Sequence, residues 1–534
     1  MVISPSKIEN KVESSLSLSQ IIPLIRSHTL FLSSFVSENF MSGSLMNLLK
    51  HILLVLFLLI LLLPLTQTIF QPFKEKNLNG FFILNDKPDL KRFTWRRWFD
   101  GSFQDHYIKG TEDNIGLRNS LFRLHNQYDF SLFGISHAQG FIKGKDHYLF
   151  EEDYIYEYTG KYFIGKSTLE KKFNKLKDIQ EQLKSLNIEL IPVIEPGKAS
   201  YYPEFIPDHY NPDKKTLSNH DYFLQLFNKL DIRYFDLNNH FLRLKNSAPY
   251  PLFTKYGMHW SLYGVALATD TLIKFLARDH PEKIPSMQIG EIELSDSLRY
   301  TDNDIGNMLN LVFPLPKILA AYPQMDFEND PGKKKLSVLV IADSYYLNIV
   351  NGIADKIFGK EEYWYYNSKV YPDIIDNDNP VYIDKSDLRK KLSEFDVILL
   401  MSSEINMHCG YWNFIEEVYQ AFHPEYKESY ISKVENLIRN QREWFRFMVG
   451  KAHKQGVTLE EMIRIDAEYT FYNDYNNIQN KNIEDSIAYI AINIKNNPEW
   501  LQQVNEKAKA RNVPLEEMIE QDARYQYEQQ RKKE

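Results

Sequence analysis

The sequence predicts an α/β fold in which a mostly parallel sheet lies between two layers of helices. Short apolar segments alternate with amphipathic helical patterns between residues 166 and 401, as expected for βα units. One long apolar stretch near the N-terminus predicts a transmembrane helix that precedes this domain. An internal repeat of helical periodicity predicts an all-α region that follows it.

The apolar stretch covers residues 50–70. Its uninterrupted part, Ile52–Leu65, is short for a membrane span, but the residues up to position 70 extend it to the roughly 20 that a bilayer requires. A cleaved signal peptide is the alternative, although Thr66-Gln67-Thr68 is a poor cleavage site. We therefore expect an uncleaved anchor. Residues 1–49 are expected to be a disordered tail, unless translation begins at Met46.

Three further segments follow the anchor. Residues 71–92 read as a polar linker, residues 93–425 as the α/β domain and residues 426–534 as two helical hairpins. Within the domain, Ser167-Thr-Leu-Glu170 predicts a capping box at the start of a helix. The other predicted elements are strands at 188–194, 232–237, 336–342 and 395–401 and helices at 221–230 and 262–277.

The helical hairpins are two copies of one pattern. Ile438–Trp444 corresponds to Ile494–Trp500, and Leu459–Ile463 to Leu515–Ile519, at a constant offset of 56 residues. Neither copy shows a pattern of catalytic residues. We expect them to pack on the α/β domain and to serve docking or stabilisation.

Composition excludes some classes of function. With 63 basic and 71 acidic residues the net charge is -8, so nothing indicates a nucleic-acid partner. The single cysteine, Cys409, excludes an intrachain disulfide and a cysteine-rich zinc site. Aromatic residues make up 14% of the chain, which fits core packing better than sugar stacking.

Two segments carry candidate chemistry. The apolar run Val338–Ala342 ends in Asp343-Ser344, where an α/β esterase or acyltransferase places its nucleophile. His259 lies in a glycine-bounded turn before a predicted helix and could serve as the base. Each has a simpler explanation: Asp343-Ser344 could only cap the next helix, and His259 could be a buried, hydrogen-bonded histidine.

The order of several short motifs resembles that of the AlgX/AlgJ-type SGNH hydrolase-like family, which are periplasmic polysaccharide O-acetyltransferases. The resemblance covers about residues 95–419 and excludes the helical repeats. It implies a three-layer α/β/α SGNH-like domain in which the histidine precedes the serine. The motifs are Trp98-Phe-Asp-Gly101, Gly116-Leu-Arg118, Gly144-Lys-Asp-His-Tyr-Leu-Phe150, Pro196-Gly-Lys198, His259-Trp260-Ser261 and Asp343-Ser344.

The resemblance implies Ser344 as nucleophile, His259 as base and an aspartate two residues before the histidine, where this chain has Gly257. The missing acid could be replaced by Glu404, Asp343, Glu195 or a backbone carbonyl. We favour Glu404, because it follows a predicted parallel strand, and keep Asp343 as a second candidate. Backbone N–H groups near Ser344 are expected to hold the oxyanion.

The expected function is that of a single-pass protein of the bacterial inner membrane whose periplasmic domain acetylates a cell-surface or secreted polysaccharide. A membrane-bound O-acyltransferase is the expected acetyl-donor partner, since the chain shows no coenzyme motif and no cofactor is expected. Glu404, Asn406 and His408 could suggest a metal site, but their spacing fits loop residues better. The alternatives are a carbohydrate acetylesterase and a non-catalytic polysaccharide-binding or assembly protein.

Overall fold

The computed structural model describes residues 43–80, 86–328, 334–374, 380–479 and 481–532. The chain forms two compact units. The smaller unit extends to Asn77 and includes Phe81–Phe122, and the larger one comprises Leu78–Gly80 and the chain from Arg123 onward.

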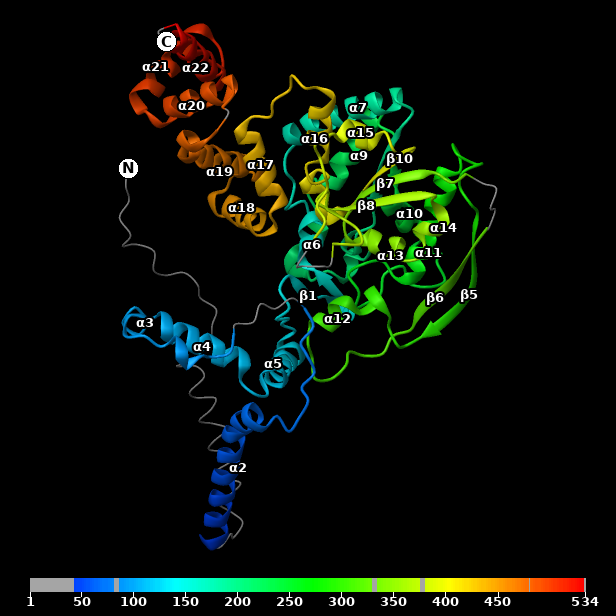
Figure 1. The fold of residues 1–534 in the computed structure, drawn as a ribbon, viewed down its shortest axis with the longest axis vertical. Coiled ribbons are helices and arrows are strands. Elements are labelled where there is room, and N and C mark those ends of the chain that lie inside the picture. Colours follow the sequence, from blue (N-terminus) through cyan, green and yellow to red (C-terminus); the bar gives the residue numbers. More distant parts are fainter. Residues whose placement is uncertain (1–42, 81–85, 329–333, 375–379, 480, 533–534) are drawn as a thin grey trace. The chain divides into compact units, whose positions relative to one another are not determined.

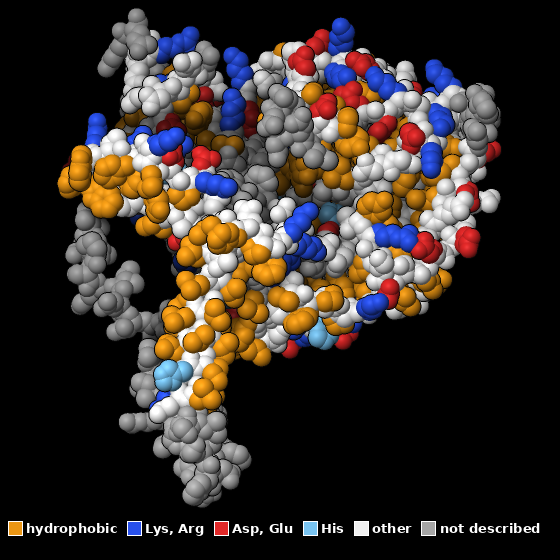
Figure 2. All heavy atoms as spheres, turned by 60° about the horizontal axis from the view of Figure 1, so that its bottom comes forward, with side chains coloured by type: hydrophobic (Ala, Val, Ile, Leu, Met, Phe, Trp, Pro, Cys, Tyr) orange, Lys and Arg blue, Asp and Glu red, His pale blue; other side chains and the backbone are white. Residues whose placement is uncertain are grey.

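The smaller unit contains the apolar helix α2 (Gly43–Phe70). Among the described residues, α2 is the one helix long and apolar enough to cross a membrane, over Met46–Phe70 with a mean hydropathy of 2.7. A signal sequence would have the same properties. Its side chains form a continuous hydrophobic surface in Figure 2. The rest of the unit is η1 (Leu90–Arg92), α3 (Trp95–Phe99), α4 (Ser102–Asn114) and the first turn of α5 (Arg118–Phe133).

The larger unit is built on a six-stranded sheet of order β4-β3-β10-β7-β8-β9 (Figure 1). All pairs are parallel except β8 with β9, which confirms the predicted mostly parallel sheet. The strands are β3 (Glu189–Glu195), β4 (Phe235–Asp236), β7 (Ser337–Ala342), β8 (Lys360–Tyr365), β9 (Lys369–Val370) and β10 (Val397–Ser403). Two antiparallel pairs lie outside this sheet: β1 (Phe141–Lys143) with β2 (Leu149–Glu151), and β5 (Met287–Ser295) with β6 (Ala320–Phe327).

Successive residues of the central strands point to opposite faces and enter different cores, as the period of two requires. On β7, Leu339 and Ile341 join one cluster, while Val338 and Val340 join the other. The first cluster packs under α7 (Lys166–Ser185), α9 (Asn219–Lys229), α15 (Leu388–Leu392) and α16 (Phe414–Phe422). The second packs under α8 (Lys198–Tyr201), α10 (Leu237–Leu244), α11 (Leu262–Leu276), α13 (Leu347–Val350) and α14 (Ala354–Ile357) (Figure 1). The result is a three-layer α/β/α domain.

The predicted capping box at the start of α7 is wrong. The helix begins at Lys166 after Gly165, whose φ of 94° suits a glycine. The N–H and hydroxyl of Thr168 donate instead to Glu460, at 3.0 and 2.9 Å. A carboxylate from the C-terminal region therefore satisfies this helix end, a pairing across 292 residues that no local pattern encodes.

Each C-terminal repeat contains three helices, so the prediction of two-helix hairpins is wrong. The first copy is α17 (Tyr430–Asn440), α18 (Arg442–Gln455) and α19 (Leu459–Asp474), and the second is α20 (Ile483–Asn496), α21 (Pro498–Arg511) and α22 (Leu515–Arg531). The first copy shares a core with the α/β domain, whereas the second has its own. The side chains that the first copy buries in the shared core are Val434, Ile438, Phe445, Met448, Val449, Ala452, Leu459, Met462, Ile463 and Ala467.

We expect the two copies to differ in their effect on stability. A chain ending at Ile478 should keep a folded α/β domain, because the second copy has a separate core. A chain ending at Tyr426 should not fold, because each large apolar side chain removed costs about 1.5–3 kcal/mol against a total stability of about 5–15 kcal/mol. Thermal melts followed by circular dichroism check both. A cooperative, native-like melt of the shorter chain would contradict the shared core.

Candidate active site

Ser344 follows β7 at the carboxyl edge of the sheet and opens the short helix η7 (Ser344–Tyr346). The preceding Asp343 is fully buried and holds this turn. Its Oδ1 accepts the N–H of Tyr345 at 3.0 Å, and its Oδ2 accepts the N–H and hydroxyl of Ser403 at 3.0 and 2.6 Å. The Asn406 amide donates to the same Oδ2 at 2.8 Å. Asp343 thus ties the end of β7 to the end of β10 and makes no contact with His259 among these bonds.

His259 is buried in the turn before α11, and both of its ring nitrogens have partners. Nε2 lies 2.9 Å from the Ser344 Oγ, and Nδ1 lies 2.7 Å from Asp304 Oδ2. Because a carboxylate can only accept, Nδ1 carries the proton and Nε2 is left to accept the serine proton. The structure therefore brings Ser344 and His259 together, as the sequence predicted, and adds Asp304 as the third member.

Asp304 is the first residue of α12 (Asp304–Met308), and its two carboxylate oxygens have different partners. Oδ2 contacts the His259 ring, while Oδ1 accepts the N–H groups of Met258 and Ile305, both at 2.7 Å. One side chain thus fixes the imidazole and the backbone just before it. Sequence reasoning missed Asp304, because it lies 45 residues after the histidine and follows no predicted strand.

The prediction that Glu404 supplies the acid is not met by this geometry. Glu404 opens the helix η8 (Glu404–Cys409) after β10, where its Oε1 accepts the Asn238 amide and lies 3.6 Å from His220 Nδ1. Burial raises the pKa of Glu404 to about 8, so it is mostly protonated at neutral pH. Glu195, another candidate, is also buried, and burial and the Asp343 charge raise its pKa. A backbone carbonyl is not needed, since Asp304 occupies Nδ1.

Gly257, where the family pattern has its aspartate, has no room for a side chain. A Cβ there would lie 2.5 Å from the Thr301 carbonyl oxygen and 2.8 Å from the Thr254 Oγ1. The segment that delivers Asp304 thus runs through the space that an acid at position 257 would need. Lys198 also holds the backbone at Gly257: its Nζ donates to the carbonyls of Gly257 and Lys255 at 2.6 and 3.0 Å.

Two pKa shifts describe the environment of this turn. Burial alone would lower the pKa of His259, but the Asp304 hydrogen bond and the charges of Asp304, Asp343 and Glu151 outweigh it and raise the pKa. Burial lowers the pKa of Lys198 to about 7, against the attraction of Asp304. Lys198 is a positioning residue for the histidine turn. The Pro196-Gly-Lys198 motif does not indicate this contact.

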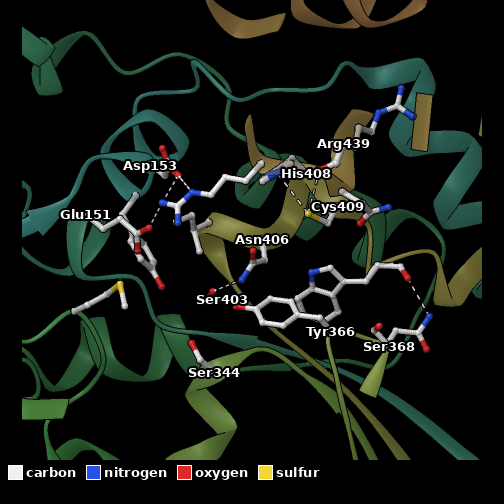
Figure 3. A pocket seen from close by; sticks show the side chains of 17 residues that line it. Glu151, Asp153, Ser344, Tyr366, Ser368, Ser403, Asn406, His408, Cys409 and Arg439 are labelled. Atoms are coloured by element: carbon white, nitrogen blue, oxygen red, sulfur yellow. Dashed lines mark hydrogen bonds and ion pairs between the residues drawn. The ribbon is translucent and has the colours of Figure 1, made fainter. Parts of the chain in front are cut away.

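Ser344 lines a cavity of about 570 Å³ that also reaches the C-terminal helices (Figure 3). Arg439, Asn440 and Arg442 come from α17 and α18, so the first repeat, which was expected to serve only docking or stabilisation, also forms part of the cavity wall. Arg442 forms ion pairs with Glu151 and Asp153. The other lining residues are Tyr154, Met258, Tyr366, Asn367, Ser368, Ser403, Ile405, Asn406, His408, Cys409 and Trp412.

The cavity wall includes an unusual backbone segment. Gly410, Tyr411, Trp412 and Asn413 all have left-handed φ values, between 50° and 69°. Such a conformation costs about 1–2 kcal/mol for each residue with a side chain, and consecutive examples are rare. The turn places Trp412 against Tyr366, with ring centroids 5.1 Å apart, at the edge of the cavity. Strain of this size is typical of binding and catalytic sites.

Residues 141–311 match the family model described as "SGNH hydrolase-like domain, acetyltransferase AlgX". This segment is therefore similar to the SGNH hydrolase-like domain of the AlgX family. This confirms the resemblance inferred from the motifs. The matched segment includes His259 and Asp304 but ends before Ser344, whose Oγ contacts His259 Nε2. No curated protein matches the chain.

Several solved structures resemble the chain at low identity. The O-acetyltransferase domain of Pseudomonas putida AlgJ is 14% identical, with 50% of this chain and 92% of that chain covered and a TM-score of 0.33. Pseudomonas aeruginosa AlgX is 12% identical, with 53% and 67% covered and a TM-score of 0.37. Bacillus cereus PatB1 is 13% identical, with 49% and 95% covered and a TM-score of 0.31.

We expect Asp304→Asn to lower kcat/KM for an acetyl ester by up to ~10⁴-fold, the loss found when the acid of a serine protease triad is neutralised. The base must be neutral, so activity rises with pH through the His259 pKa. Because Asp304 raises that pKa, its loss should move the acid limb of the pH profile to lower pH. Steady-state rates across pH measure both effects.

Glu404→Gln is the matched control for this experiment. Glutamine mimics the protonated carboxyl that burial favours at Glu404, so its rate near neutral pH should stay close to that of the native protein. If Glu404→Gln were as damaging as Asp304→Asn, the acid assignment made from the structure would be wrong.

We expect Gly257→Asp to destabilise the protein by about 1–3 kcal/mol, the usual cost of overpacking, rather than to improve the site. Thermal denaturation measures the loss. Gly450→Ala on α18 is the control, since nothing lies within 4 Å of a Cβ there and alanine favours a helix. A Gly257→Asp substitution that melted normally and restored activity to Asp304→Asn would show that the two positions are interchangeable.

Proposed function

We propose that this protein is a membrane-anchored O-acetyltransferase that acetylates a polysaccharide through an acyl-enzyme on Ser344. The observation that carries the proposal is the unbroken hydrogen-bonded line from Ser344 through His259 to Asp304 at the wall of a cavity. The match to the acetyltransferase AlgX family model supports the type of reaction. The apolar helix α2 supports the anchor.

In the first half-reaction, the Ser344 Oγ attacks the carbonyl carbon of an acetyl ester while its proton moves to His259 Nε2. The imidazolium is stabilised by Asp304, which keeps the ring in place through Nδ1. The C–O bond to the donor breaks, and His259 returns the proton to the leaving oxygen. Ser344 then carries the acetyl group.

In the second half-reaction, a sugar hydroxyl gives its proton to His259 and attacks the acetyl carbon, and Ser344 recovers its proton as the ester is released. The oxyanion is held by the N–H of Ser344 and by the Asn406 amide, which lines the same cavity. Asn406 donates to Asp343 at 2.8 Å and only weakly, at 3.3 Å, to Ser403 Oγ, which leaves one of its N–H groups able to turn to the cavity.

The setting follows from the anchor. With α2 in the inner membrane, the domain works in the periplasm, where coenzyme-bound acetyl groups are not supplied. A membrane-bound O-acyltransferase is therefore the proposed donor partner, and a cell-surface or secreted polysaccharide is the proposed acceptor. Of the aromatic side chains in the cavity wall, the half-buried Tyr366 ring suits stacking against a sugar ring.

We expect full-length protein in detergent to be labelled by a fluorophosphonate probe, and expect labelling to be lost in Ser344→Ala and His259→Ala. Ser185→Ala, at the exposed end of α7, controls for surface serines. An acetyl ester supplied with an oligosaccharide should give acetylated sugar rather than free acetate. Labelling retained in Ser344→Ala refutes the nucleophile, and acetate alone would favour a carbohydrate acetylesterase.

A further inference from the structure

The end of the apolar helix α2 is fastened to the turn between α4 and α5. The Gly116 N–H donates to Thr68 Oγ1 at 2.7 Å, and a Cβ on Gly116 would lie only 2.5 Å from the Thr68 nitrogen. The Ser120 N–H and hydroxyl donate to Glu75 Oε1 at 3.0 and 2.7 Å. Within the smaller unit, the turn that connects α4 to α5 therefore lies next to the C-terminal end of the apolar helix.

The chain just after α2 is turned back rather than extended. The buried Gln67 side chain donates to the Phe73 carbonyl at 2.6 Å and accepts the Phe73 N–H at 3.2 Å. These two bonds fix the direction in which the chain leaves α2. Together with the bonds of Gly116 and Ser120, these contacts hold the turn between α4 and α5 close to the end of α2.

The short helix α3 in this unit has an unusual surface. Trp95, Trp98 and Phe99 lie at spacings i, i+3 and i+4, so they share one face, and they are 68%, 43% and 81% exposed. Arg96 lies beside that face, and Arg97, at i+2, lies on the opposite side of the helix. Protein surfaces in contact with water seldom expose three large aromatic side chains together, so this face indicates a binding surface.

The aromatic face is rigidly held. The Phe93 ring contacts Trp95 and Phe103, with centroids 5.4 and 5.2 Å apart, and Phe103 is a buried residue of α4. The Thr94 side chain caps α3 by accepting the Arg97 N–H. The aromatic side chains are therefore already ordered in the free protein, so binding does not require α3 to fold.

Aromatic and basic side chains in this combination match the headgroup region of a bilayer. Tryptophan prefers that region because its ring is apolar while its N–H can bind water or headgroups. Helices that lie in the interface combine such an aromatic face with basic flanks that attract anionic lipids. The segment Lys91–Arg97 contains four basic residues around Phe93 and Trp95.

We propose that α3 is an interfacial anchor that lies in the headgroup region of an anionic bilayer, on the side where α2 ends. The proposal goes beyond the acetyltransferase function and rests on it only for the insertion of α2. We favour a lipid surface over a protein as the partner of this face, for two reasons. The membrane helix α2 belongs to the same unit, and the aromatic face has basic residues around it.

The test uses spin labels on the full-length chain in vesicles of phosphatidylethanolamine and phosphatidylglycerol. Phe99→Cys places a label on the aromatic face, and Glu112→Cys places a control label on an exposed, charged position of α4. Leu56→Cys reports the insertion of α2. Cys409, the native cysteine, is buried, and the unsubstituted chain gives the background. Collision with oxygen, which enters the bilayer, is compared with collision with a nickel chelate, which stays in water.

The proposal predicts that the labels at positions 99 and 56 collide more with oxygen than with the nickel chelate, whereas the label at position 112 shows the reverse. Replacing Arg96 and Arg97 by glutamine should lower the ratio of inserted to free α3 on the order of fivefold per charge removed. The proposal is overturned if position 99 behaves like position 112. It is also overturned if both collision reagents are excluded from position 99, the sign of a protein partner, or if position 56 is not in the bilayer. None of these results depends on catalysis, so failure of the acetyltransferase proposal would be seen separately.

Discussion

The site depends first on the buried carboxylate of Asp343. Parallel strands end at the same edge of a sheet, but nothing in the ladder itself fixes how their loops meet there. Asp343 supplies this link, because its two oxygens accept four hydrogen bonds from the turn after β7 and from the end of β10. The orientation of Ser344, the position of Asn406 and one wall of the cavity all follow from that single side chain.

The histidine reaches the serine through a second, separate set of contacts. The buried Lys198 binds the Gly257 carbonyl in the turn that carries the histidine. Asp304 binds both the His259 ring and the adjacent backbone N–H of Met258. These contacts come from segments far apart in the chain. The serine edge and the histidine turn meet at the 2.9 Å contact between Oγ and Nε2 and at Tyr345, whose hydroxyl donates to the Met258 carbonyl at 3.3 Å and whose ring lies 4.8 Å from the His259 ring.

The sequence was sufficient for the features that local pattern encodes. The strands at β3, β7 and β10 and the helix α11 were predicted because buried runs and periodicity are local, and Ser344 and His259 were predicted because they end or precede such elements. Asp304 was not, because an acid on a short irregular helix has no local signal. The same limit explains Glu460, which caps α7, and Arg442, which reaches the cavity: both lie in segments whose periodicity shows only that they are helical.

The shared core of the first C-terminal repeat has a consequence for how the chain is made. The strands of the sheet are complete by Ser403, yet the apolar surface of the domain is closed only when Phe445, Met462 and Ala467 are present. A chain emerging from its N-terminus must therefore keep a nearly finished sheet with one uncovered face until these residues arrive. The helices of the first repeat thus complete the domain: a product terminated before them exposes hydrophobic surface and is open to proteases, so few such partial chains can persist beside the whole protein.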